Sequence, residues 1–107
     1  MTPKLFKLVY FVPEEALHST RDAVFAAGGG RIGEYERCSW FTRGTGTFLA
    51  GAGADPAVGK VGEEEHVPEF RVELVVSAER LRAAVDALRG AHPYEEVAFD
   101  LVPLHVL

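Results

Sequence analysis

The sequence has only one cysteine, few basic residues and no long apolar run. A lone Cys38 excludes an internal disulfide bond and a cysteine-rich zinc site. Eleven Lys and Arg residues against 16 Asp and Glu residues give a net charge of −5 at pH 7. Because binding to a phosphate backbone needs a basic patch, we expect no nucleic-acid partner. The N-terminal apolar run is short and contains Lys7, so we expect neither a membrane span nor a signal peptide, and a cytoplasmic location.

The sequence does contain enough apolar material for one folded domain. Hydrophobic residues make up 48% of the 107 positions, and a chain of this length is typical of one domain. We therefore expect residues 1–107 to form a single domain. A domain this small leaves much of its surface exposed, so association with copies of itself would stabilise it.

Two segments of the sequence read as a strand followed by a helix. The apolar run Leu5–Val12 predicts a strand that stops at Pro13, and the helix after it ends at Gly28–Gly30. The alternating run Val67–Val76 predicts a second strand. Ser77 is placed to cap the following helix, which we expect to end at Gly90.

The middle of the sequence predicts a hairpin and a long loop. Ile32–Thr42 is strand-like, Arg43-Gly44 is a turn signal, and Thr45–Leu49 is expected to return as an additional hairpin strand. Ala50–Glu65 reads as a loop, and its length suggests that it has a functional role. Val97–Leu104 is expected to be the last strand.

An internal repeat supports a ferredoxin-like fold. Shifting Leu8–Ala27 by 64 positions superposes it on Val72–Ala91, with Leu17 over Leu81 and Asp22 over Asp86. Two strand–helix halves, each followed by a strand, give the α/β (α+β) order β-α-β-β-α-β. Right-handed crossovers place both helices on one face of the sheet. We expect nearly apolar strands on the other face, and therefore a second subunit that covers it.

Four motifs carry a resemblance to a known family: Gly30–Ser39, Gly44–Phe48, Asp55–Gly62 and His92–Asp100. In order and spacing they resemble the domain inserted in many bacterial dinuclear-metal-centre proteins, the NGG-interacting-factor-three-like family. The resemblance implies a fold like that of the PII signalling proteins and the copper-tolerance protein CutA, which are trimers. The family's two-metal site belongs to flanking domains that are missing here. We therefore expect a stand-alone domain, and no family metal ligand is carried onto this chain.

The segment His92-Pro93-Tyr94-Glu95-Glu96 is the most suggestive candidate site. An imidazole nitrogen followed by two carboxylates, at His92, Glu95 and Glu96, suits Zn²⁺ or another divalent ion. The structural alternative is a helix-to-strand corner, in which Pro93 stiffens the turn and Tyr94 anchors it. We weight this alternative more heavily, because successive strand residues point to opposite faces and one histidine does not complete a site.

Three weaker candidates lie elsewhere in the sequence. Cys38 is a further metal or nucleophile candidate, although a lone strand cysteine is more often a small buried apolar residue. His66 follows the acidic run Glu63–Glu65, which favours cations unless it is simply a solvated charge run. Gly44, Thr45, Gly46 and Thr47 offer N–H and hydroxyl groups for an anion, but a tight hairpin explains them as well.

These observations leave three functional hypotheses. The leading one is a non-enzymatic, trimeric PII/CutA-like module that binds a small ligand or a divalent metal at subunit clefts. The second is an oligomerisation or docking module for a partner protein. The third is a metal-dependent hydrolase, for which the sequence shows neither a nucleophile–base pair nor a complete ligand set. No cofactor other than a divalent metal is indicated.

Overall fold

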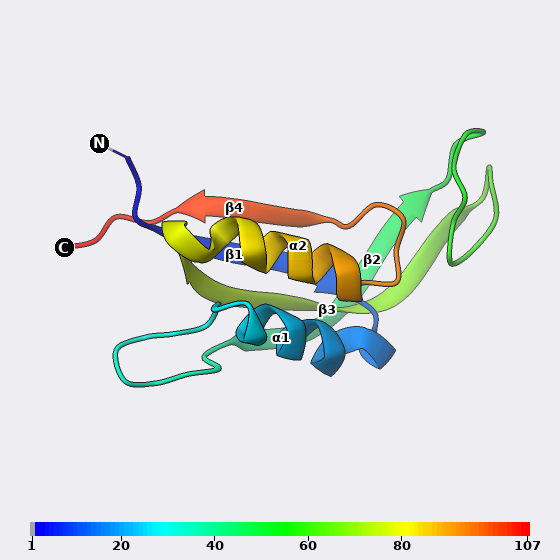
Figure 1. The fold of residues 1–107 in the computed structure, drawn as a ribbon. Helices are drawn as coiled ribbons and strands as arrows, with labels where there is room; N and C mark the ends of the chain where they lie inside the picture. The colour runs from blue at the N-terminus through cyan, green and yellow to red at the C-terminus, as the bar shows by residue number, and fades with distance from the viewer. Residues whose placement is uncertain (1) are drawn as a thin grey trace.

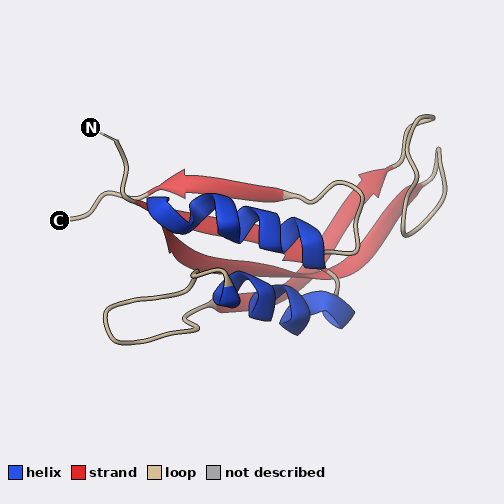
Figure 2. Ribbon diagram, viewed as in Figure 1, coloured by secondary structure: helices blue, strands red, loops and turns tan. Residues whose placement is uncertain are grey.

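The computed structural model describes residues 2–107 and has the predicted ferredoxin-like order. Its elements are β1 (Leu5–Val12), the 3₁₀ turn η1 (Glu14–Ala16), α1 (Leu17–Ala26), β2 (Trp40–Leu49), β3 (Glu64–Ser77), the 3₁₀ turn η2 (Ala78–Arg80), α2 (Leu81–Ala91) and β4 (Phe99–Pro103). The four strands form one antiparallel sheet in the order β2-β3-β1-β4. Both helices cover the same face of this sheet (Figure 1, Figure 2). No helix in this range is long and apolar enough to cross a membrane.

The predicted internal repeat is visible in the backbone. Pro13 and Ser77 lie 64 residues apart and have nearly the same dihedral angles, φ −68° and ψ 156° against φ −69° and ψ 154°. Each is followed by a three-residue 3₁₀ turn and then by an α-helix that begins at Leu17 or Leu81. Ser77 occupies the predicted N-cap position, before η2, but its side chain makes no capping hydrogen bond. The two halves therefore share a backbone conformation and not a side-chain cap.

The core lies between the sheet and the two helices. Alternate residues of the central strands point into it, as the period of a strand requires: Leu8, Tyr10, Val12, Val72, Leu74 and Val76. They pack against apolar residues that recur at helical spacing: Leu17, Val24, Ala84 and Leu88. All ten are less than 10% exposed, and the alternation predicted for Val67–Val76 is confirmed by the burial of Val72, Leu74 and Val76.

The predicted hairpin in the middle of the chain is wrong. Residues 31–39 form a loop, in which Ile32 and Tyr35 exchange backbone hydrogen bonds, and the strand begins only at Trp40. β2 then continues without a turn through Gly44 and Gly46, which pair with Glu69 and Val67 of β3. The ladder to β3 satisfies these backbone groups, so the glycines do not need to turn the chain. The long loop after β2 covers residues 50–63, close to its predicted limits.

Two local expectations about glycine and cysteine are also corrected. Gly28 follows α1 with a φ of +107°, as predicted for a helix end, but Gly90 lies inside α2, which continues to Ala91. Glycine can keep helical angles at a modest cost, and here the helix ends at His92 instead. Cys38 lies in the loop before β2 and is half-buried, so the expected buried strand position is wrong.

The face of the sheet opposite the helices is less apolar than the sequence suggested. Lys7, Val9 and Phe11 of β1 point to this open face, opposite Val75, Glu73 and Arg71 of β3. The Glu73 carboxylate accepts a hydrogen bond from Arg71 Nε at 3.0 Å and lies 3.9 Å from Lys7 Nζ. The register therefore places charges beside the apolar residues of β1.

β2 and β3 extend beyond the rest of the sheet. The last pair between β1 and β3 is Val12 with Phe70, whereas the ladder between β2 and β3 continues to Leu49 and Glu64. This two-stranded arm and the loop at its tip project past the helices in Figure 1 and contribute to the 46 Å length of the molecule. The arm forms one wall of the candidate site.

Candidate functional site

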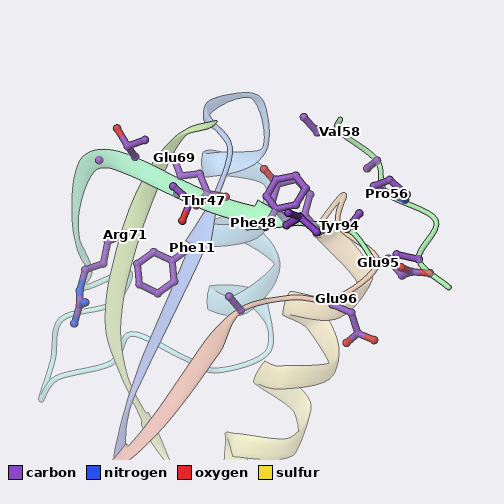
Figure 3. A pocket seen from close by; sticks show the side chains of 18 of the residues that line it. Phe11, Thr47, Phe48, Pro56, Val58, Glu69, Arg71, Tyr94, Glu95 and Glu96 are labelled. Carbon is purple, nitrogen blue, oxygen red and sulfur yellow. The ribbon is translucent and has the colours of Figure 1, made fainter. Parts of the chain in front are cut away.

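A groove of about 690 Å³ lies where the arm meets the open face of the sheet. Three parts of the chain enclose it. β2 supplies one wall, the loop after β2 supplies Pro56 and Val58, and the segment between α2 and β4 supplies Tyr94, Glu95 and Glu96 (Figure 3). Phe11 and Arg71 line it from the open face of the sheet. These parts are distant in sequence, so the groove exists only in the folded chain.

Two glycines of β2 give the groove a floor without side chains. Gly44, Gly46 and Phe48 are every second residue of β2, so they lie on the same face of the sheet as Glu69 and Arg71. A methyl group on Gly44 would meet no atom within 4 Å, so the space above this position is open. A methyl group on Gly46 would collide with the Glu69 carboxylate, which lies directly over that glycine.

A hydrogen bond closes one end of the groove. The Asp55 backbone N–H donates to Glu95 Oε1 at 3.2 Å. This bond joins the loop after β2 to the segment after α2, two parts of the chain that are 40 positions apart. The predicted candidate Glu95 therefore holds the loop in place with one of its oxygens.

Tyr94 brings a polar group without a partner to the groove. Its hydroxyl is fully buried and makes no hydrogen bond with any residue in the range 2–107. Burial is the main cause that raises the pKa of Tyr94 to about 12, followed by the charge of Glu69, the hydrogen-bonding effect of the same carboxylate, and the charge of Glu15. The phenol is therefore neutral near pH 7 and can both donate and accept a hydrogen bond.

His92 fixes the backbone of Tyr94 through hydrogen bonds of its ring. Its Nε2–H donates to the backbone carbonyl of Phe11 at 2.7 Å, and its Nδ1 accepts from the Tyr94 backbone N–H at 3.1 Å. This pattern assigns the neutral tautomer with the proton on Nε2. Burial is the main cause of a lowered pKa for His92, against smaller opposing effects of the Phe11 carbonyl and Glu69. Both ring nitrogens are engaged, so in this conformation neither is available to a metal.

The groove brings together one part of the predicted candidate set. Gly44, Thr45, Gly46, Thr47, Glu95 and Glu96 all line it. Cys38 and His66 do not: the Cys38 thiol faces the Glu36 carbonyl at 3.8 Å, and His66 Nε2 lies 3.2 Å from Glu64 Oε2. Within residues 2–107 of one copy, no three His, Cys, Asp or Glu side chains are grouped as a metal site.

The sequence did not indicate several groove residues. Phe11 and Phe48 read only as strand residues, and Tyr94 reads as the anchor of a turn. Glu69 reaches the groove because it pairs with Gly44 across two strands, a register that no local pattern specifies. The one usable signal was the Gly-Thr-Gly-Thr run, which leaves a strip of strand without large side chains.

Comparisons with known proteins agree with this fold. No family model matches the chain. A Mycobacterium tuberculosis protein named GTP cyclohydrolase 1 type 2 homolog is 52% identical over 100 residues, which cover 94% of this chain and 26% of that protein. The solved structure of a Bacillus cereus protein related to NIF3 has a TM-score of 0.83 at 38% identity, over 97% of this chain and 26% of that one.

A third comparison matches this chain to most of a shorter protein of the same fold. CutA1 from Shewanella sp. SIB1 has a TM-score of 0.73 at 12% identity, over 99% of this chain and 86% of that one. The chain spans about a quarter of the length of the curated relatives that it matches. The predicted resemblance is confirmed: nearly the whole chain is similar to one quarter of the NIF3-related proteins named GTP cyclohydrolase 1 type 2 homologues, and this part has a CutA/PII-like ferredoxin fold.

Proposed function

We propose that the chain is a binding module that holds a small organic molecule in the groove and associates with copies of itself. The observation that supports this most strongly is the groove of about 690 Å³ itself, which is lined by the aromatic side chains Phe11, Phe48 and Tyr94 and by a few polar groups. Small-molecule sites are typically clefts of roughly 300–1,000 Å³ with apolar walls and a few polar groups.

The groove is also largely preformed. The bond between Asp55 N–H and Glu95 Oε1 holds the loop against the segment after α2, and His92 fixes the backbone of Tyr94. A site that is ordered before binding loses less conformational entropy when a ligand enters. This supports a binding role for the loop that the sequence marked as unusually long.

Within the described residues, the groove offers carboxylates and hydroxyls, but not the other side chains that enzymes use as bases or nucleophiles. In the described part of the chain, no histidine, cysteine or lysine lines the groove. Such side chains commonly serve as bases or nucleophiles. The relatives' name refers to GTP, but this chain covers only about a quarter of them, so an activity of the whole protein does not transfer to it.

The projecting arm supports self-association. An isolated pair of strands is marginally stable in water, yet this arm and its loop expose Leu49 at 60%, Val58 at 36% and Val61 at 48%. Trp40 at the other end of β2 is 59% exposed. We propose that a second copy covers these side chains, with the trimer of the CutA-like fold as the expected assembly.

Two alternatives to a small organic ligand follow from the same fold. A divalent metal would need donors from more than one copy, since the candidates do not gather within one. Calorimetric titration of metal-stripped protein with Zn²⁺, Cu²⁺ and Mn²⁺ tests this alternative. A docking module would use the exposed arm for a partner protein and leave the groove empty.

The proposal is tested by native mass spectrometry of protein purified without chelators. We expect an oligomer that carries a small additional mass, which is lost in Gly44→Leu because the added side chain fills the open space above the β2 floor. Gly90→Leu is the matched control, since it adds the same side chain at an open position of α2 away from the groove. A bare monomer at micromolar concentration, or an added mass that Gly44→Leu retains, would refute the proposal.

A further inference from the structure

We propose that the groove selects an apolar, flat molecule that carries a positive charge, such as a protonated aromatic amine. This inference rests on the proposed function and specifies the chemical class of its ligand. It follows from three features of the groove: its unbalanced carboxylates, its aromatic side chains and its glycine floor.

The ionisable side chains of the groove are mainly acidic. Glu69, Glu95 and Glu96 line it, against the single cation Arg71. Arg71 is paired with Glu73, because its Nε donates to Glu73 Oε2 at 3.0 Å, and Lys7 Nζ lies 3.9 Å from the other oxygen of this carboxylate. Its guanidinium also lies 5.7 Å from the centre of the Phe11 ring, which holds it against the wall. The groove therefore presents negative charge to a ligand.

Glu69 is the carboxylate placed to meet a ligand charge. It is half-buried over Gly46, and it forms no ion pair within the described residues. A partly desolvated carboxylate without a counter-charge is unfavourable, and an organic cation beside it would relieve that cost. The Glu69 carboxylate is close enough to the buried Tyr94 hydroxyl to raise the pKa of that phenol. The two polar groups therefore lie next to each other.

The rest of the groove suits a flat apolar body. Phe11, Phe48 and Tyr94 supply aromatic faces and edges from three different parts of the fold (Figure 3). Aromatic faces attract cations as well as apolar rings. Gly44 leaves bare backbone next to the Glu69 carboxylate, which covers Gly46, and a planar group can lie on this open position.

The same features disfavour a phosphorylated ligand. A phosphate in the groove would be repelled by Glu69, Glu95 and Glu96, and the one cation, Arg71, is already paired. α1 begins on the groove side of the fold and α2 ends there (Figure 1), and the first turn of neither helix lines the groove. A nucleotide of the kind that the relatives' name mentions is therefore not the ligand we infer.

Calorimetric titration with three indoles of similar shape tests the inference. Tryptamine is a cation at pH 7, tryptophol is neutral, and indole-3-propionate is an anion. We expect tryptamine to bind about tenfold more tightly than tryptophol, since a charge-assisted bond is worth about this much. Indole-3-propionate should bind most weakly.

Variants of Glu69 test whether this carboxylate causes the preference for the cationic indole. Glu69→Gln should reduce the advantage of tryptamine to about threefold or less, and Glu69→Lys should make indole-3-propionate the preferred ligand. Glu79→Gln removes the same charge from an exposed position in η2 and should leave the preference unchanged. A thermal melt of each variant confirms that it folds, and the Glu69→Lys inversion remains informative if Glu69→Gln binds weakly.

The possible failures are distinct. Equal binding of all three indoles, lost in Gly44→Leu, would overturn the charge preference and leave the proposed function intact. A preference for tryptamine that persists in Glu69→Gln would overturn the role of Glu69. No heat from any indole up to millimolar concentration would overturn this ligand class, while an added mass seen by native mass spectrometry would still support the groove as a site.

Discussion

The Nε2 of His92 lies 2.7 Å from the backbone carbonyl oxygen of Phe11, which precedes it by 81 positions. This bond fastens the end of α2 to the end of β1. The ring's other nitrogen accepts from the Tyr94 backbone N–H, so the histidine that resembled a metal ligand instead orients one wall of the groove. Its role is to position Tyr94.

Acidification should weaken the fold through His92. Burial lowers the His92 pKa below its ordinary 6.5 in the folded chain, so the unfolded chain binds this proton more readily. Stability from this group is complete above about pH 6.5 and is lost as the pH falls further. Urea unfolding at pH 7.5 and pH 5 should show a larger loss for the native chain than for His92→Gln, whose side chain does not titrate. Equal losses would contradict this account.

The two glycines of the groove floor should respond differently to alanine. Gly46→Ala forces the Glu69 carboxylate to move, because the new methyl group occupies its place. Glu69 is flexible, so the free energy of unfolding should change by about 1 kcal/mol or less, while tryptamine affinity falls. Gly44→Ala meets no atom within 4 Å and should retain most of the affinity. Similar affinities for both variants would show that Glu69 does not contact the ligand.

Tyr94→Phe should be nearly neutral at pH 7.5. The hydroxyl that it removes is buried and has no partner within the described residues, so no hydrogen bond is lost. At high pH the free energies of unfolding of the native chain and of Tyr94→Phe should diverge. The pKa of Tyr94 is raised to about 12, so the folded chain holds this proton more tightly, and stability is lost as the pH rises from 10 towards 12. A shallower alkaline decline in Tyr94→Phe, followed by urea unfolding, checks the prediction. A clear loss of stability at pH 7.5 would mean that the hydroxyl has a partner.

Removing either side of the buried hydrogen bond between Tyr10 of β1 and Thr20 of α1 should cost different amounts of stability. Thr20 Oγ1 donates to the Ala16 carbonyl at 2.8 Å, so the Tyr10 hydroxyl, 2.9 Å away, donates to Thr20. Tyr10→Phe leaves Thr20 bonded and should cost about 0.5–1.5 kcal/mol. Thr20→Val leaves the Tyr10 hydroxyl buried and unpaired, and should cost about 1–3 kcal/mol. Denaturant unfolding of the two variants measures the difference, and a larger cost for Tyr10→Phe would reverse the assigned direction of the bond.

Gly30 should be among the least replaceable glycines. Its φ is +77°, and a methyl group there would lie 2.6 Å from the Phe25 ring. Its N–H donates to the Val75 carbonyl at 2.8 Å, and its own carbonyl accepts from Cys38 N–H at 2.7 Å. Backbone strain and overpacking together should make Gly30→Ala destabilising by about 2–5 kcal/mol.

Gly33→Ala is the control for this position. Its φ of +57° is also left-handed, but no atom lies within 4 Å of the added methyl group. The loss should therefore be limited to about 1–2 kcal/mol of backbone strain. Thermal unfolding of both variants separates the two causes, and equal losses would mean that contact with Phe25 is unimportant.

Local patterns in the sequence were reliable where neighbouring residues alone set the secondary structure of a segment. The repeat at 64 positions predicted two matching strand–helix units, and Pro13 and Ser77 have almost the same backbone angles. The apolar run Leu5–Val12 is the central strand β1, and its residues Leu8, Tyr10 and Val12 lie in the core. The interpretation failed at Gly44, because a Gly-Thr-Gly-Thr run is compatible with a turn and with a strand. The partner strand β3 decides between them by satisfying the backbone.

The sequence by itself determined the order of elements, the core and the resemblance to NIF3-related proteins, because hydrophobic period and motif spacing are properties of neighbouring residues. Only the tertiary structure decided what the candidate residues do. Glu95 and Glu96 joined a groove, His92 became a support for Tyr94, and Cys38 and His66 lay outside it. These outcomes depend on contacts between residues up to 81 positions apart. Strand register and chain crossing set such contacts, and no local pattern encodes them.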